Sequence, residues 1–130
     1  MKIINSLALC GLLSFSISYT TFSQSFDGFA LYNLQNQNTT YLINKDGNIE
    51  HSWSCSVPCN YAVLLKDNGN IVRGGVYPNN QLNGPVPAIG GLIQEIDPSG
   101  NTVWEFVYST ADHCSHHDIT LLPNGNVILT

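Results

Sequence analysis

The chain alternates short apolar runs with polar turns that contain a glycine. Four such turns recur, in the segments LINKDGNIEHSW, LLKDNGNIV, QEIDPSGNTVWEF and LLPNGNVIL. In each segment apolar residues precede the turn, and an Asn follows its glycine and leads into a further strand-like run. The four glycines are placed to take the positive φ that tight hairpin turns require: Gly47, Gly69, Gly100 and Gly125. The pattern therefore predicts four β-hairpins.

These hairpins are of two alternating kinds. Two of the turns lead to a tryptophan, at Trp53 and Trp104, and the other two follow a leucine pair, at Leu64–Leu65 and Leu121–Leu122. Hairpins of the same kind recur 53 and 56 residues apart. Because two hairpins make four strands, the repeat is a four-stranded unit of just over 50 residues. A repeat of this length and strand number is typical of a β-propeller blade.

The repeat predicts an all-β fold, a partial β-propeller of about two blades. The complete unit would have strands over 61–66, 70–75, 92–97 and 102–108. Strands of a preceding unit are predicted over 29–33, 40–44 and 48–53, and the first hairpin of a following unit over 117–122 and 126–129. A compact β-sandwich of eight or nine strands is the alternative. The long connection over 77–91, rich in Pro and Gly, is either a functional loop or a surface excursion.

Because a propeller closes with four or more blades, we expect residues 24–130 to form an incomplete propeller domain. Its open sheet edges would be exposed, and the end of the chain at Thr130 would be an interruption of the fold.

The first 23 residues predict a signal peptide. Lys2 gives a positive start, 3–17 is mostly apolar without charge, and Thr21–Ser23 offers small residues for cleavage before Gln24. A retained membrane anchor is the alternative, but the stretch is short for a bilayer span and diluted with Ser and Thr. We therefore expect an exported protein, periplasmic or secreted, with no stable membrane span.

Charge narrows the range of partners. Removal of 1–23 leaves three basic residues against nine acidic ones. Binding to nucleic acid or to an anionic membrane surface needs clustered Lys and Arg, so neither partner is expected.

Three cysteines follow the predicted cleavage site. A disulfide between Cys55 and Cys59 would close a tight loop, whereas one between Cys59 and Cys114 would join two repeats. The sequence does not choose between these pairings. A single CxxxC pair does not specify a zinc site.

The segment His116-His117-Asp118 lies just before the last predicted hairpin. When Leu121 is laid on Leu64, no histidine stands at the corresponding place in the preceding unit, so the strand start does not require one. Three readings remain open: a solvated strand start, a metal site built from His113, His116, His117 and Asp118, and a catalytic or substrate-binding histidine. Alternation along a strand would send His116 and His117 to opposite faces, which argues against the metal site.

Two other polar residues invite a functional reading. Arg73 is the only arginine, and either binds an anion or pairs across strands with an acid. His51 is expected to be an exposed residue on its strand, beside Trp53.

Four blocks together resemble the arylsulfotransferase family of exported bacterial propellers. They are YLINKDGNIEHSW, LLKDNGNIVR, GGLIQEIDPSGNTVWEFVYS and HHDITLLPNGNVIL, and the resemblance spans roughly residues 28–130. The specific part is HHD before LPNGNV, following IDPSGNTVWE. The resemblance implies a six-bladed propeller that transfers a sulfuryl group from a phenolic sulfate ester to a phenol through a histidine intermediate. It implies no nucleotide donor and no cofactor.

The resemblance also implies roles for individual residues. His117, with His116 as its close competitor, would contact the sulfuryl group or act as acid and base, and Asp118 would orient an imidazole or cap the strand start. The nucleophilic histidine and its supporting arginine come from later blades, so we expect the 130 residues to be inactive. The alternative is a non-enzymatic propeller that binds carbohydrate or protein through 77–91, Tyr77 and Trp104.

Overall fold

The computed structural model describes residues 27–82 and 90–129, and every regular element in these two ranges is a β-strand. Within them no helix is long and apolar enough to cross a membrane. The predicted signal peptide lies outside the described residues. The strands are β1 (Phe29–Asn33), β2 (Thr39–Asn44), β3 (Ile49–Ser54), β4 (Cys59–Leu65), β5 (Ile71–Val76), β6 (Gly91–Ile96), β7 (Thr102–Val107), β8 (Ile119–Leu121) and β9 (Val127–Leu129).

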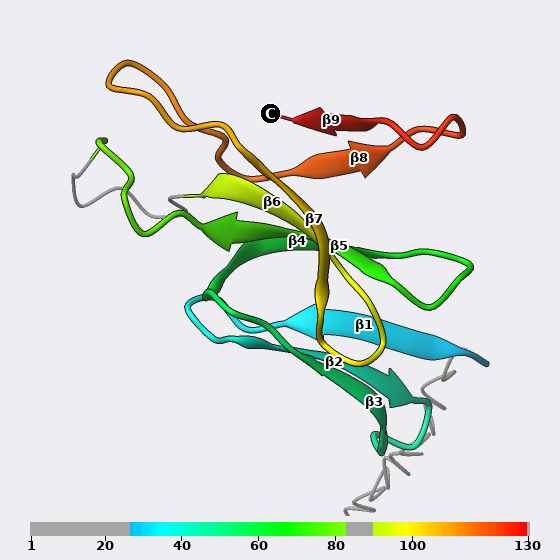
Figure 1. Ribbon diagram of the computed structural model, residues 1–130. Coiled ribbons are helices and arrows are strands. Elements are labelled where there is room, and N and C mark those ends of the chain that lie inside the picture. Colours follow the sequence, from blue (N-terminus) through cyan, green and yellow to red (C-terminus); the bar gives the residue numbers. More distant parts are fainter. Residues whose placement is uncertain (1–26, 83–89, 130) are drawn as a thin grey trace, which may run out of the picture.

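The strands form three antiparallel sheets in chain order. The first sheet is β1-β2-β3, the central sheet is β4-β5-β6-β7, and the C-terminal hairpin is β8-β9. Figure 1 shows the central sheet between the other two. The all-β prediction and the complete four-stranded unit are confirmed. Each predicted strand agrees with an observed one to within two residues at either end.

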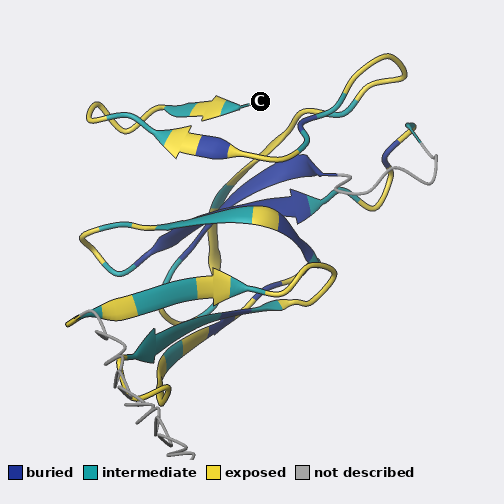
Figure 2. Cartoon of the chain, turned by 180° about the vertical axis from the view of Figure 1, so that it is seen from behind, coloured by how far each residue is buried: buried dark blue, intermediate teal, exposed yellow. Residues whose placement is uncertain are grey.

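Each interface between sheets has its own apolar core. Trp53, Cys55, Ile71 and Ile96 are buried between the first and central sheets. Val72, Ile93 and Ile119 are buried between the central sheet and the C-terminal hairpin. Successive residues of a strand point to opposite faces, which is why Ile71 and Val72 belong to different cores. The middle strands of the central sheet, β5 and β6, are accordingly the most deeply buried part of the molecule (Figure 2).

All four hairpin turns close with the same two backbone hydrogen bonds. At the first turn the Asn44 N–H donates to the Asn48 carbonyl, and the Gly47 N–H donates to the Asn44 carbonyl, both at 3.0 Å. The same pair of bonds recurs in the turns that begin at Lys66, Asp97 and Leu122. The glycine of each turn has a φ between 81° and 88°. This left-handed conformation explains why a glycine recurs there, as predicted.

The turn hydrogen bonds fix which residues are equivalent between units. Matching Asn44 to Asp97 makes Phe106 the equivalent of Trp53, and Trp104 the equivalent of His51. The two tryptophans are therefore not equivalent, and the spacing of 53 residues read from the turn glycines agrees with this match. Trp104 and Phe106 lie on the same face of β7, because residues two apart along a strand point the same way.

The start of the last hairpin differs from the prediction in a way that bears on the site. β8 begins at Ile119, so His117 and Asp118 precede the strand instead of opening it. Matching the turn at Lys66 to the turn at Leu122 makes His117 the equivalent of Tyr61, and His116 the equivalent of Asn60. The sequence alignment of Leu121 on Leu64 was thus displaced by one residue.

Candidate functional site

His116 and His117 form a pair of contacting imidazole rings. Their ring centroids are 3.9 Å apart at an interplanar angle of 70°, and the two Nδ1 atoms face each other in hydrogen-bond contact. The expectation that the two side chains point to opposite faces is wrong. Alternation holds only inside a strand, and both residues lie in the irregular segment before β8.

This segment is fixed at both ends. Ser115 is buried, and its carbonyl and hydroxyl oxygens both accept from the Gly91 N–H, at 3.1 and 3.0 Å. At the other end Ile119 is buried in the core beneath the C-terminal hairpin. The Asp118 carboxylate accepts from the Ile119 N–H at 2.8 Å, a contact that fits the strand-start role, one of the two roles expected for it. The histidine pair is therefore held between two anchored positions.

Tyr61 of the central sheet supports the pair from one side. Its ring stacks on His117 with centroids 5.4 Å apart and an interplanar angle of 15°. The backbone beneath it is tied to the first sheet, because the Asn33 side-chain amide donates to the Tyr61 carbonyl at 3.1 Å. Three sheets thus contribute to the position of one imidazole.

Asn60 supplies a buried polar group beside the same segment. It is 4% exposed, and its Oδ1 atom has no hydrogen-bond partner among the described residues. A Cβ at Gly90 would lie 2.7 Å from the Ser115 carbonyl and 2.8 Å from the Asn60 side-chain nitrogen, so only glycine fits there. The same Cβ would lie 3.3 Å from the His116 carbonyl, so Gly90 is bordered both by the Asn60 side chain and by the backbone of His116.

The four polar residues considered as a metal site are not gathered into one. His113 lies instead against Tyr108, with ring centroids 5.1 Å apart. Across residues 27–82 and 90–129, no group of three or more His, Cys, Asp or Glu side chains is placed to hold a metal ion.

Among residues 27–82 and 90–129, Arg73 pairs with no acid. Its two terminal nitrogens both donate to the Val57 carbonyl, at 3.1 and 3.0 Å, and the side chain is fully buried. It stands two residues after Ile71 and so faces the first sheet. The expectation that Arg73 pairs across strands with an acid is therefore wrong. In the described part of the chain, the pair between a cation and a carboxylate is Lys66–Glu95.

The three cysteines are free thiols in the structure. Cys55 and Cys59 are buried, and the Cys59 thiol donates to the Leu34 carbonyl at 2.8 Å. Burial raises the pKa of the Cys55 thiol, and the neighbouring Arg73 guanidinium offsets part of that rise. Which of the cysteines pair under oxidising conditions stays a prediction.

His51 is less exposed than expected. Its Nε2 atom contacts the Pro98 carbonyl at 3.0 Å, and its ring meets Trp53 edge-on with centroids 4.5 Å apart. The residue links the first sheet to the β6–β7 turn of the central sheet.

Glu95 is a buried carboxylate that the sequence reasoning missed. It accepts hydrogen bonds from Lys66 at 2.8 Å, from Asn70 at 2.6 Å and from the Trp104 indole at 2.7 Å. Burial alone would raise its pKa, but the three donors outweigh burial and hold the pKa below its ordinary value. The single charged residue in the strand-like run GLIQEI was the available signal, because a buried charge needs partners.

The two aromatic residues named for a binding module are not brought together. Tyr77 lies beside Gly91, at the start of β6. Trp104 pairs across strands with Glu95, near the end of β6. The connection between them includes residues 83–89, outside the described part of the chain.

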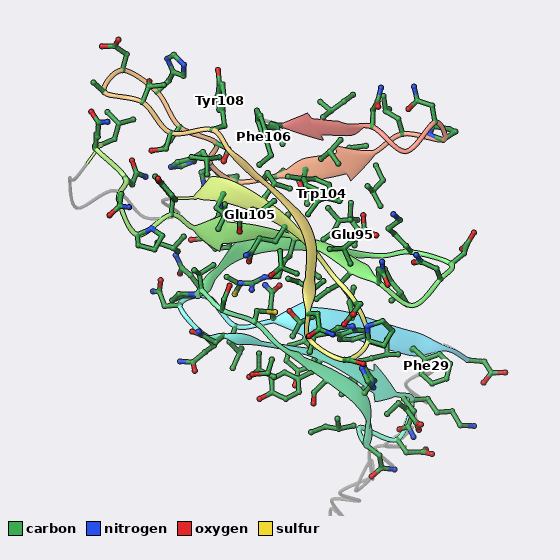
Figure 3. All side chains as sticks on the ribbon, in the orientation of Figure 1. Phe29, Glu95, Trp104, Glu105, Phe106 and Tyr108 are labelled. Carbon is green, nitrogen blue, oxygen red and sulfur yellow. The ribbon has the colours of Figure 1, made fainter. Side chains whose placement is uncertain are left out.

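An apolar groove of about 400 Å³ does lie next to Trp104, between β7 and the C-terminal hairpin (Figure 3). It is lined by Ile93, Trp104, Glu105, Phe106, Gly125, Asn126, Val127 and Leu129.

Comparison with known proteins assigns the chain to no family. No protein-family model matches it, and no curated protein matches it at a significant level. A functional assignment therefore depends on the histidine site and on the resemblance of the four sequence blocks.

Proposed function

We propose that the chain is part of a β-propeller of the arylsulfotransferase type, in which the His116–His117 pair binds the sulfuryl group of a phenolic sulfate. The observation that carries this proposal is the contact between the two imidazoles, with His117 stacked on Tyr61. The four-stranded antiparallel central sheet, flanked by sheets built from the same hairpins, supports the blade interpretation. Export directed by residues 1–23 belongs to the same proposal.

The contact between the two Nδ1 atoms gives the pair its chemistry. The two Nδ1 atoms face each other, so one ring can donate a hydrogen bond that the other accepts. A protonated imidazole can donate to the oxygens of a sulfate ester as charge builds on them. The same proton can pass to the departing phenolate. His117 is exposed and His116 half-buried, and the Tyr61 ring covers one face of the His117 imidazole.

The role proposed for the pair is binding and proton transfer, not nucleophilic attack. The resemblance places the attacking histidine and its arginine after the HHD block, and residues 119–130 contain neither residue type. Arg73 does not take the arginine's place, because its guanidinium is committed to Val57 on the face toward the first sheet. We therefore expect the 130 residues to bind an aryl sulfate without turning it over.

The test is a titration of the full chain with 4-nitrophenyl sulfate, followed by NMR of the four imidazoles. We expect the ring signals of His116 and His117 to shift together and saturably, while those of His51 and His113 stay in place. In a parallel assay with phenol as acceptor, release of 4-nitrophenolate should not exceed the uncatalysed rate. Equal shifts at His113, or no saturable shift at the pair, would refute the proposal.

A further inference from the structure

Two of the three cysteines are held against the same short segment of the first sheet. The Cys55 N–H donates to the Asn38 carbonyl at 2.8 Å, and the Asn38 side-chain amide donates back to the Cys55 carbonyl at 3.1 Å. The Cys59 N–H donates to the Gln37 carbonyl, also at 2.8 Å. Because Gln37 and Asn38 are adjacent, the connection between β1 and β2 fixes both ends of the segment Cys55–Cys59.

The residues between these two cysteines are packed on the central sheet. The Val57 carbonyl accepts from both terminal nitrogens of Arg73, at 3.1 and 3.0 Å. The Ser56 hydroxyl accepts from the Gln94 side-chain amide at 3.2 Å. A Cβ at Gly75 would lie 2.9 Å from the Cγ2 atom of Val57, so a larger residue at this position of β5 would displace the loop. The loop is therefore fixed at its middle as well as at its ends.

The two thiols lie in one buried interface. Cys55 belongs to the core between the first and central sheets. Cys59 is 1% exposed, and its thiol donates to the Leu34 carbonyl, just after β1 of the first sheet. Burial is the main reason that the pKa of the Cys55 thiol is raised, and the nearby Cys59 thiol adds to the rise. The two sulfur atoms are thus neighbours on the side of β4 that faces the first sheet.

Cys114 belongs to a segment that Cys59 does not face. Successive residues of a strand point to opposite sides, so Asn60 points away from the first sheet while Cys59 points toward it. A Cβ at Gly90 would contact both the Asn60 side chain and the Ser115 carbonyl. Asn60, and not Cys59, is therefore the residue of β4 that meets the segment containing Cys114.

We propose that Cys55 and Cys59 form a disulfide that closes the connection between the first and central sheets. As the sulfur–sulfur bond forms, the two thiols lose two protons and two electrons, and a small disulfide such as oxidised glutathione accepts them and becomes two thiols. Because both thiols are buried in the folded chain, the exchange takes place before the two sheets pack together. The proposal does not depend on the function of the histidine pair.

The test is refolding of the reduced full chain in a mixture of reduced and oxidised glutathione. Cys10 is replaced by Ser, so that only the three cysteines after residue 23 compete. Remaining thiols are alkylated, and the chain is cut after lysine and arginine. One fragment, 46–66, then contains two cysteines, and the fragment 74–130 contains Cys114.

Mass spectrometry of these fragments distinguishes the pairings. We expect fragment 46–66 to carry no alkyl group and to lack two hydrogens, with no bond to fragment 74–130. A bond between the two fragments, or alkylation of both cysteines in 46–66, would overturn the proposal. Cys114→Ser is the matched control and should leave the yield of the bond unchanged.

A synthetic peptide of residues 46–66 shows whether the fold contributes to the bond. The ratio of disulfide to dithiol is measured in the same glutathione mixture for the peptide and for the chain. We expect the ratio to be roughly tenfold or more higher in the chain, because a disulfide that stabilises a fold is stabilised equally by that fold. Equal ratios would contradict the inference that the packing of the two sheets positions the thiols.

Discussion

His117 stacks on Tyr61, and the two residues occupy the same position in successive sheets. The ring centroids are 5.4 Å apart, and the turn hydrogen bonds make the two residues equivalent. The repeat therefore places an aromatic ring from one unit against the His117 imidazole of the next. The neighbouring position carries Asn60 in one unit and His116 in the other, so the fold accommodates different polar residues there.

The stack should contribute to ligand binding through the orientation of His117. Replacing Tyr61 with Leu removes the ring, and we expect the affinity for 4-nitrophenyl sulfate to fall roughly threefold to tenfold, as for the loss of one aromatic pair. Tyr61→Phe keeps the ring and should bind like the native chain. Calorimetric titration gives the comparison, and equal affinity in the Leu and Phe variants would show that the stack has no such role.

Glu95 should make the stability of the fold depend on pH in the acid range. Its folded-state pKa lies below the ordinary value of 4.5, so its contribution is complete above that value and is lost as the pH falls through the folded pKa. Glu95→Gln should cost about 1–3 kcal/mol at neutral pH, as for the loss of hydrogen bonds to a buried charge. Urea unfolding at several pH values measures the difference between native chain and variant.

That difference should shrink as the medium becomes more acidic, because protonation removes the advantage of Glu95 over Gln. A difference that stays constant through the acid range would contradict the pKa shift. The native chain and the variant share all other carboxylates, so the effect of those carboxylates on the free energy of unfolding cancels in the difference.

Two turn glycines with the same conformation should differ in their tolerance of alanine. Gly47 has a φ of 81° and open space around it, whereas a Cβ at Gly100 would lie 3.0 Å from the Ser54 carbonyl. Gly47→Ala should therefore cost only the backbone strain, about 1–2 kcal/mol. Gly100→Ala should cost more, because it adds a contact with backbone that cannot move aside. Chemical unfolding of both variants tests the order, and the reverse order would contradict the geometry of the β6–β7 turn.

Arg73 should act through its volume and its two bonds to Val57. Arg73→Ala leaves a cavity and an unpaired carbonyl, whereas Arg73→Met fills most of the space and removes a buried charge that has no carboxylate partner. We expect the Ala variant to be less stable than the Met variant by at least about 2 kcal/mol. Urea midpoints provide the measurement. Equal stability of the two variants would mean that filling the space of the Arg73 side chain contributes nothing to the free energy of unfolding.

The strands were predictable from the sequence because the information is local. Alternating apolar residues and turn glycines such as Gly47 specify a hairpin within about a dozen residues. It was harder to predict which residues correspond between units, because LLKDNG has one more residue than LLPNG between its leucines and its glycine. That single residue displaced the predicted match of His117 from Tyr61 to Asn60.

The site itself was predictable in its residues but not in its geometry. His116 and His117 were named from the sequence, yet their contact depends on β8 starting at Ile119, two residues later than expected. The partner of Arg73 depends on the connection between the first and central sheets, which brings the Val57 carbonyl to it. No pattern along the chain encodes such a contact between distant segments.

The central claim is that the histidine pair recognises the sulfuryl group, and the most direct test compares two ligands that differ by that group. The affinities of the full chain for 4-nitrophenyl sulfate and for 4-nitrophenol are measured by calorimetry, together with those of the double variant His116→Gln, His117→Gln and of the control His113→Gln. We predict that the native chain and the control prefer the sulfate ester, and that the double variant loses this preference. A preference that survives in the double variant, or that is absent from the native chain, would contradict the account.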